Sequence, residues 1–405
     1  MRRPATRALY AVFLAALVLG AGALSPQLWR WARFPSAIWT GEGGHLALLT
    51  PLEGRLDAGV PGRYTVRLPL LPGLQAASRP VTVHVMPPVE VIPGGESVGV
   101  MLRAKGAVVQ SLASFPESPA RAAGIRPGDV ILAVDGRRLD GIGDLMRAVE
   151  GAGRAGRPLR LQIQRGAAVL TLEARPRKID GQYRLGLWVR DTAAGVGTVT
   201  FYDAQSRTVV ALGHRVSDEQ GDPYPMRDGK FVTALVSGVR PSRQGEPGEK
   251  LGVFLHVQQP LATIRANTAY GLFGRLSGRP PAKRPVPVAW EDQVRPGPAE
   301  MVTVVQGLRP EAFRVEIERV IHSDQPSARS FVLRVTDPRL LQATGGIVQG
   351  MSGSPVLQDG RLVGAVTHVF VHDPTRGYGV FAQWMLEQGG LLHGKEDGKE
   401  LSMVS

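Results

Sequence analysis

Short alternations of apolar and polar residues, broken by glycine and proline, run through most of the chain. HLALLTPL, RYTVRLPLL and VTVHVMPPVEV lie between residues 36 and 90, and each has the period-two pattern of a half-buried strand. We expect these strands to form a small β module over residues 36–90. Because this segment contains no cluster of chemically reactive side chains, its expected role is that of a spacer or membrane-proximal support.

Apolar strands and glycine-marked turns also follow one another through residues 178–405, where few helical patterns interrupt them. Examples are TVTFYD, TVVALGH, KFVTALVSGV, MVTVVQGL and SFVLRV, with a single helix predicted late, in FAQWMLEQGG. Strands at these intervals are typical of a β-sandwich or barrel. We therefore expect a mainly β fold in which residues 178–405 form a chymotrypsin-like double β-barrel.

The N-terminal pattern is different. A cationic start, MRRPATR, precedes an uncharged and largely apolar run at residues 8–24. As a helix this run would span about 25 Å, at the short end of what crosses a bilayer, with its cationic flank inside. We predict a signal anchor within residues 1–30, membrane attachment, and export of the remaining chain. Because AGA at residues 21–23 has the form of a signal-peptidase site, removal of the segment is the alternative.

Composition narrows the range of functions. The 405 residues are 43% hydrophobic and 20% charged, which excludes general disorder. The absence of cysteine excludes disulfides, thiol catalysis and thiolate metal sites. The formal net charge is +13, but the basic residues are spread along the chain, so we expect no nucleic-acid partner. We also expect no organic cofactor and no metal, since H-E-x-x-H occurs nowhere.

Residues 91–176 resemble a PDZ domain. The stretch AGIRPGDVILAVDG is the most specific part of the resemblance. PDZ domains bind a peptide by adding it as a strand between their second strand and second helix. The position that matches their carboxylate-binding loop is Ser97-Val98-Gly99-Val100. The resemblance therefore implies that these four residues bind a peptide.

A serine lies on a glycine-rich bend near the C-terminus, in GGIVQGMSGSPVLQDG. Ser352 follows Gly350 by two positions, so that the amides of these two residues can converge as an oxyanion hole. Ser354 is the rival hydroxyl, but it precedes Pro355 and is restricted to extended geometry, which suits the start of the next strand. A hairpin turn without catalytic meaning is the alternative interpretation, because glycine, serine and proline are also turn residues.

A nucleophilic serine needs a base, and the base needs an orienting group. Among the eight histidines, His214 ends the strand TVVALG and opens a polar loop, a position from which its ring can face a cleft. His368 and His372 lie closer to the serine in sequence and compete for the role of base. Spacing does not select the acid from Asp203, Asp218, Asp337 and Asp373.

Two long segments carry a family resemblance. GIVQGMSGSP with GAVTHVFVHDPTRGYGVFAQWML, and GVGTVTFYDAQSRTVVALGH, closely resemble the stage IV sporulation protein B (SpoIVB) serine peptidases. The resemblance covers nearly the whole chain and implies a catalytic His214, Asp337 and Ser352. The other candidate histidines and aspartates then become neighbours. The sequence departs from the family pattern at Arg215, where a smaller residue is expected.

The resemblance also implies a function. Family members lie between the mother-cell and forespore membranes, cleave themselves, and then cleave a regulator of an intramembrane metalloprotease. This cleavage leads to activation of the late mother-cell sigma factor. One alternative is a non-catalytic, membrane-tethered PDZ scaffold, which the presence of all three catalytic residue types disfavours. A second is an envelope quality-control protease, which the position of the PDZ domain before the peptidase disfavours.

Overall fold

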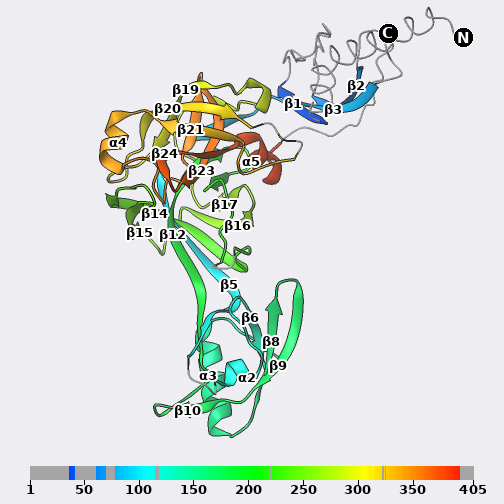
Figure 1. The fold of residues 1–405 in the computed structure, drawn as a ribbon, viewed down its shortest axis with the longest axis vertical. Coiled ribbons are helices and arrows are strands. Elements are labelled where there is room, and N and C mark those ends of the chain that lie inside the picture. Colours follow the sequence, from blue (N-terminus) through cyan, green and yellow to red (C-terminus); the bar gives the residue numbers. More distant parts are fainter. Residues whose placement is uncertain are drawn as a thin grey trace, which may run out of the picture.

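The computed structural model describes residues 36–41, 61–69, 78–114, 118–218, 221–321, 323 and 325–392. This part of the chain is mainly β, as predicted (Figure 1). None of its helices has both the length and the apolar character that a membrane crossing needs. The predicted anchor, within residues 1–30, lies outside the described residues.

The N-terminal module is a three-stranded sheet that packs on the C-terminal part of the chain. Its strands are β1 (Ala37–Gly41), β2 (Gly62–Pro69) and β3 (Ser78–Met86), in the order β1-β3-β2. Trp39 stacks on His84 with ring centroids 4.8 Å apart. Its ring is nearly perpendicular to that of Trp384, with centroids also 4.8 Å apart. Thr40 Oγ1 donates to Asp292 Oδ2 at 2.6 Å. The module is therefore attached to the body of the protein by aromatic packing.

Six strands form a first closed ring. They are β5 (Ser97–Leu112), β12 (Leu187–Asp203), β13 (Thr208–Ala211), β14 (Met226–Arg240), β16 (Ala262–Thr268) and β17 (Gly271–Leu276). The order is β12-β13-β17-β16-β14-β5, and pairing of β12 with β5 closes the ring. The short β4 (Glu90–Pro93) and β18 (Val286–Pro287) extend the sheet, and β15 (Glu249–Leu255) pairs with β14. Branched apolar side chains alternate inward along these strands, as expected for a barrel core.

The second barrel is also six-stranded and closed. Its strands are β19 (Gly297–Thr303), β20 (Glu311–Val320), β21 (Phe331–Val335), β22 (Pro355–Gln358), β23 (Arg361–Phe370) and β24 (Asp373–Phe381). Helix α4 (Pro338–Thr344) connects β21 to the serine-containing bend, and α5 (Ala382–Gln388) follows β24 where the helix was predicted. The η2 turn (Glu291–Gln293) precedes this barrel. Two six-stranded rings agree with the expected double-barrel arrangement.

The PDZ part lies at the far end of the molecule from α5 (Figure 1). It contains α2 (Pro119–Ala122), β6 (Val130–Val134), β7 (Arg137–Arg138), α3 (Ile142–Arg154), β8 (Leu159–Arg165), β9 (Ala168–Ala174), β10 (Arg177–Ile179) and β11 (Gln182–Arg184). It has an apolar core of its own around Ile131, Leu161 and Ile163. The long strands β5 and β12 run from this core into the first barrel. Half of β5, which the sequence analysis placed in the PDZ domain, therefore belongs to the barrel.

Ser97-Val98-Gly99-Val100 do not form a peptide-binding loop. They begin β5 and pair with the Gly195–Thr198 segment of β12. Val98, Gly99 and Val100 also pair with β14 on their other edge, and all four residues are buried. Strand addition needs a free edge, so the prediction of a peptide site at Ser97–Val100 is wrong. The pattern of a PDZ loop was present, but both edges of the strand are used by the barrel.

The groove beside the second PDZ helix is filled by the chain itself. Leu187–Arg190 of β12 pair antiparallel with the Val108–Leu112 end of β5. The amide of Ile142, at the start of α3, donates to Asp191 Oδ2 at 2.9 Å. In this arrangement β12 lies between β5 and α3, where a PDZ domain would add its ligand strand.

Candidate active site

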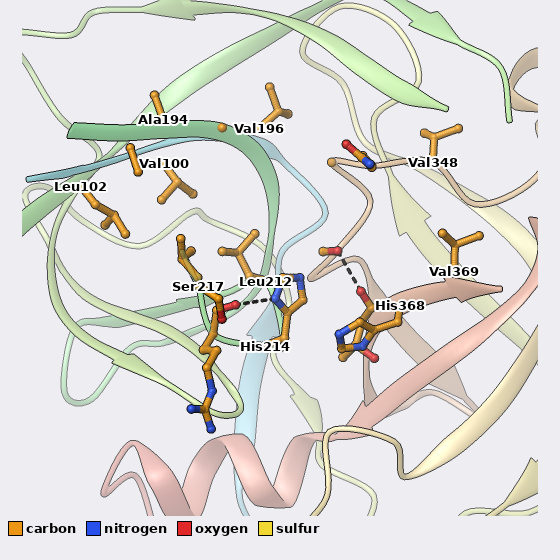
Figure 2. A pocket seen from close by; sticks show the side chains of 18 of the residues that line it. Val100, Leu102, Ala194, Val196, Leu212, His214, Ser217, Val348, His368 and Val369 are labelled. Carbon is orange, nitrogen blue, oxygen red and sulfur yellow. Dashed lines mark hydrogen bonds between the residues drawn. The ribbon is translucent and has the colours of Figure 1, made fainter. Parts of the chain in front are cut away.

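A cavity of about 580 Å³ is lined by residues of both barrels, and it contains His214 and Ser352. His214 comes from the loop after β13 of the first barrel, and Ser352 comes from the bend before β22 of the second. The fold thus brings together the two residues that the sequence analysis selected as base and nucleophile. Figure 2 shows His214 near the middle of the cavity wall, with His368 beside it.

A sharp turn presents His214 to the cavity. Leu212 and Gly213 both have positive φ, at 71° and 70°, a conformation that is uncommon for a side chain such as leucine. A Cβ on Gly213 would lie 3.0 Å from Thr367 Cγ2, so the turn packs closely on the second barrel. The amide of Leu212 donates to the carbonyl of Thr198 at 3.2 Å. These contacts fix the chain immediately before the histidine.

The hydrogen bond of His214 determines which of its nitrogens carries a proton. Nδ1 lies 2.8 Å from the carbonyl oxygen of Arg215. Because a carbonyl only accepts, Nδ1 is the protonated nitrogen in the neutral ring and Nε2 keeps its lone pair. Burial lowers the pKa of His214, and the contact with the Arg215 carbonyl opposes this effect. The ring is therefore neutral at pH 7 and is suited to accept a proton at Nε2.

Ser352 is accessible to the cavity, whereas its rival is not. Ser352 Oγ donates to the carbonyl of Thr367 at 2.9 Å. The Ser352 carbonyl accepts from the amide of Thr198 at 3.0 Å, which holds the backbone of the bend. Ser354 is fully buried, and its Oγ donates to Thr303 Oγ1 at 3.0 Å. Of the two hydroxyls, only that of Ser352 can meet a substrate.

The first predicted oxyanion donor is the amide of Gly350. In a trans peptide the carbonyl oxygen and the amide hydrogen point in opposite directions. The carbonyl of Gln349 accepts from the amide of Lys250 at 2.9 Å, so the Gly350 amide of the same peptide group points away from β15. Gly350 has φ = 91°, and a Cβ there would lie 3.1 Å from Lys250 Cβ. Both the conformation and the space select glycine.

The second predicted donor is the amide of Ser352 itself. The carbonyl of Met351 accepts from the amide of Ser354 at 2.9 Å, which turns the Ser352 amide the other way. Among the backbone bonds of the described residues, neither the Gly350 nor the Ser352 amide donates to a carbonyl. Both residues line the cavity. The bend therefore keeps two amides available for a developing oxyanion.

Asp337 is the part of the prediction that the geometry does not support. Its side chain caps α4, accepting from the amides of Arg339 at 3.0 Å and Arg314 at 3.2 Å. It also pairs with the Arg339 guanidinium at 3.0 Å. This hydrogen bond, with the two amides, lowers the pKa of Asp337 to about 2 despite the opposing effect of burial. The carboxylate is used by α4, and the hydrogen bond of His214 goes to a backbone carbonyl instead.

The site contains a second histidine. The rings of His214 and His368 have centroids 5.1 Å apart and are tilted by 38°. Burial is the main reason that the pKa of His368 falls to about 4, with smaller effects from the charges of His214 and Arg329. His368 is therefore a neutral imidazole at pH 7. The sequence analysis had placed it among the neighbours of the site, and the structure puts it on the wall of the cavity.

Apolar side chains form the remaining walls. Figure 2 shows Val348 and Val369 on one side, and Val100 and Leu102 on the other. Sequence reasoning missed the second pair because it assigned them to the PDZ domain. It also missed Lys250 of β15 and Thr198 of β12, which form hydrogen bonds with the backbone of the serine-containing bend. Single lysines and threonines in strands carry no signal until their strands are placed.

Comparison with known families agrees with this geometry. The sequence profile of the SpoIVB peptidase S55 family matches residues 181–386, about half of the chain. A PDZ domain profile matches residues 96–175. The first match includes both His214 and Ser352, and the second includes the strand β5 that the two parts share.

More distant similarities involve smaller parts of the chain. A protein of Xylella fastidiosa (strain Temecula1) named "Putative zinc metalloprotease" is 38% identical over 83 residues, 20% of this chain and 18% of that protein. A Mesorhizobium japonicum protein of the same description is 38% identical over 80 residues, with 20% and 21% covered. The chain thus spans about a fifth of the length of these curated relatives.

Two solved structures are similar over part of their length. The active form of the Rv3671c protease from M. tuberculosis has 14% identity and a TM-score of 0.29, with 52% of this chain and 77% of that chain covered. The PDZ domain of the SdrC-like protein from Listeria monocytogenes has 18% identity and a TM-score of 0.19, with 21% and 87% covered.

Proposed function

Because the chain belongs to the SpoIVB peptidase S55 family and is a serine peptidase, we propose that it is an endopeptidase with Ser352 as nucleophile and His214 as general base. One observation carries this proposal: the two side chains, one from each barrel, line the same cavity. The cavity also faces two amides that no backbone carbonyl of the described residues engages. Nucleophile, base and oxyanion donors are the minimum set for acyl transfer.

The proposed mechanism begins with a small movement of the serine. Rotation about the Cα–Cβ bond takes the Ser352 hydroxyl from the Thr367 carbonyl toward Nε2 of His214. His214 accepts the proton as Oγ attacks the substrate carbonyl, and the Gly350 and Ser352 amides stabilise the oxyanion. The imidazolium then gives its proton to the leaving amine, and water hydrolyses the acyl-enzyme. The Arg215 carbonyl keeps the proton of Nδ1 in place throughout.

For the biological role, we propose the function that the family resemblance implies. The protein would be exported, remain anchored or be released from the membrane, and lie between the mother-cell and forespore membranes. It would cleave itself and then a regulator of an intramembrane metalloprotease, leading to activation of the late mother-cell sigma factor. Membership in the S55 family supports this proposal, as does the PDZ domain that precedes the peptidase.

Self-cleavage provides the test. The full chain and its Ser352→Ala variant are expressed in parallel, and N-terminal shortening is followed on a gel and by mass spectrometry. We expect the wild type to shorten and the variant to stay intact. If both chains are cut at the same positions, the cuts come from another protease. In that case the purified regulator is added to the wild type and to the Ser352→Ala variant, and cleavage of the regulator is compared. An intact regulator with wild-type enzyme would refute the signalling role.

A further inference from the structure

Lys250 is a buried lysine whose ammonium has no acidic partner among the residues that the structure describes. It is the second residue of β15, and its side chain is almost fully buried. Nζ contacts three hydroxyl oxygens: Ser97 Oγ at 3.2 Å, Thr198 Oγ1 at 3.3 Å and Thr303 Oγ1 at 2.8 Å. A protonated ammonium has three donors, so this site offers one acceptor for each. Burial lowers the pKa of Lys250 to about 7.

This cluster touches the bend that carries the nucleophile at several points. Thr198 Oγ1 donates to the carbonyl of Gly350 at 2.7 Å. Thr303 Oγ1 accepts from Ser354 Oγ at 3.0 Å. The backbone amide of Lys250 donates to the carbonyl of Gln349 at 2.9 Å. The lysine therefore reaches both ends of the bend, through its own backbone and through two threonines.

The charge on Lys250 affects the direction of the Thr198 hydroxyl. While Nζ carries three protons, Thr198 Oγ1 accepts from it and is free to donate its own proton to Gly350. A neutral amine has two protons and one lone pair, so one of the three hydroxyls must turn to donate to it. If Thr198 turns, the Gly350 carbonyl loses its donor. A buried carbonyl without a partner is costly, and the peptide group is then less firmly held.

Within the described part of the chain, the groups that contact Nζ are uncharged hydroxyls from three neighbouring strands. Strand β5 contributes Ser97, β12 contributes Thr198, and β19 contributes Thr303. The acidic residues adjacent in sequence to Ser97 and to Lys250 are engaged elsewhere: Glu96 pairs with Lys283, and Glu249 pairs with Arg240. No carboxylate among the partners of Nζ thus stabilises its charge, and the protonated form depends on the three hydroxyls.

From these contacts we propose that Lys250 is a positioning residue for the nucleophile-bearing bend. Its ammonium directs the Thr198 hydroxyl to the Gly350 carbonyl, and so holds the Gly350–Met351 peptide group that lies between the two peptide groups carrying the Gly350 and Ser352 amides. The inference rests on the proposed peptidase mechanism, because an oxyanion hole matters only if Ser352 attacks a carbonyl. It adds a condition to that mechanism: protonated Lys250 leaves the Thr198 hydroxyl free to hold the Gly350 carbonyl, and loss of that proton weakens this hold on the bend.

The test measures the rate at which a fluorophosphonate probe labels Ser352 in the full chain, as a function of pH. Lys250→Met keeps the length of the side chain but removes the donors, and Thr198→Val keeps the shape but removes the hydroxyl. We expect each variant to label about 100-fold more slowly, the scale of losing one oxyanion donor. We expect the double variant to be little slower than either single one, because both changes break the same link.

The pH profile separates positioning from a general loss of packing. In the wild type, labelling should decline as pH rises through about 7, where Lys250 loses its proton. The decline should be absent in Lys250→Met. Lys230→Met is the matched control, since Lys230 Nζ donates to the Val257 carbonyl at 2.8 Å and neither residue lines the cavity. That control should keep the wild-type rate and profile.

The outcomes distinguish this inference from the proposed function. A wild type that is never labelled at Ser352 would overturn the peptidase mechanism, and the inference with it. A labelled wild type with unchanged rates in folded Lys250→Met and Thr198→Val would overturn the inference alone. If Lys250→Met does not fold, the inference is still tested by the labelling rate of Thr198→Val and by the decline of wild-type labelling above about pH 7. An unchanged Thr198→Val rate would contradict the role of Lys250.

Discussion

Ser352 Oγ donates its hydrogen bond to the carbonyl of Thr367, at 2.9 Å. This bond holds the hydroxyl on β23, in the same cavity as the His214 ring. A backbone carbonyl can accept a hydrogen bond from the hydroxyl, but it is too weak a base to remove the proton. The serine is therefore not activated in this position. The resting arrangement therefore requires one side-chain rotation before chemistry, which a bound substrate can favour by occupying the space next to Thr367.

The first prediction concerns the acidic limb of the pH profile. His214 acts as a base only when neutral, so activity is present above its pKa and is lost as pH falls through it. Burial lowers that pKa from its ordinary value of 6.5, which places the acidic limb below pH 6.5. The measurement is the probe-labelling rate between pH 4 and pH 7. An acidic limb clearly above 6.5 would show that the base is stabilised in its charged form, as by a carboxylate.

The second prediction separates the two histidines of the cavity. His214→Phe removes the base and should reduce labelling of Ser352 by a factor of about 10³ or more. His368→Phe keeps a ring of similar size on the cavity wall, and it should retain at least about a tenth of the wild-type rate. The same assay measures both. If His368→Phe is the more damaged variant, then His368 is the base and His214 supports it.

The third prediction concerns Asp337. Because its carboxylate caps α4, Asp337→Ala should destabilise the fold by about 1 kcal/mol, as measured by chemical denaturation. Asp337→Asn keeps a capping oxygen and should lose less stability. Both variants should label Ser352 at nearly the wild-type rate. A folded Asp337→Asn with labelling reduced about 10⁴-fold would instead assign Asp337 the orienting role.

The pH dependence of stability gives a further check on the same carboxyl. With a folded pKa of about 2 and an unfolded pKa of about 4, Asp337 stabilises the protein fully above pH 4. That contribution is lost as pH falls from about 4 to 2, because the unfolded chain binds the proton more readily. Urea denaturation of the wild type and Asp337→Ala should therefore converge at low pH. Curves that stay equally separated down to pH 2 would contradict the ion pair with Arg339.

The fourth prediction concerns the start of β5. Val98, Gly99 and Val100 are paired on both edges and buried, so their amides should exchange with deuterium as slowly as those of the barrel core. A PDZ carboxylate-binding loop would leave these amides exposed and fast to exchange. Hydrogen exchange read out by mass spectrometry distinguishes the two. Rapid exchange at residues 98–100 would restore the peptide-binding interpretation.

The sequence was most informative where a pattern is local. Strand alternation predicted a mainly β chain and the helix after residue 380, and the glycine pattern around Ser352 identified the bend. The strand-end position of His214 was also visible, although only the family resemblance made it the preferred base. These features depend on a few adjacent residues, and tertiary structure does not change them.

The sequence was least informative where partners come from distant segments. Ser97–Val100 have the pattern of a PDZ loop, and nothing local shows that β12 and β14 cover both edges. Asp337 was assigned by resemblance, yet Asp-Pro is also the usual start of a helix, and the structure uses it in that way. Lys250 and Thr198 were missed because their role depends on contacts between strands that are far apart in the sequence. The partners of Lys250 Nζ come from β5, β12 and β19.

The most direct test of the account is to find which residue forms a covalent bond with a serine-reactive probe. The wild type, Ser352→Ala and Ser354→Ala are treated with a fluorophosphonate at pH 6.5 to 7, digested, and analysed by mass spectrometry. We predict one adduct on Ser352 in the wild type, none in Ser352→Ala, and an adduct on Ser352 in folded Ser354→Ala. An adduct on another residue, or equal labelling of Ser352→Ala, would contradict the assignment of Ser352 as the nucleophile.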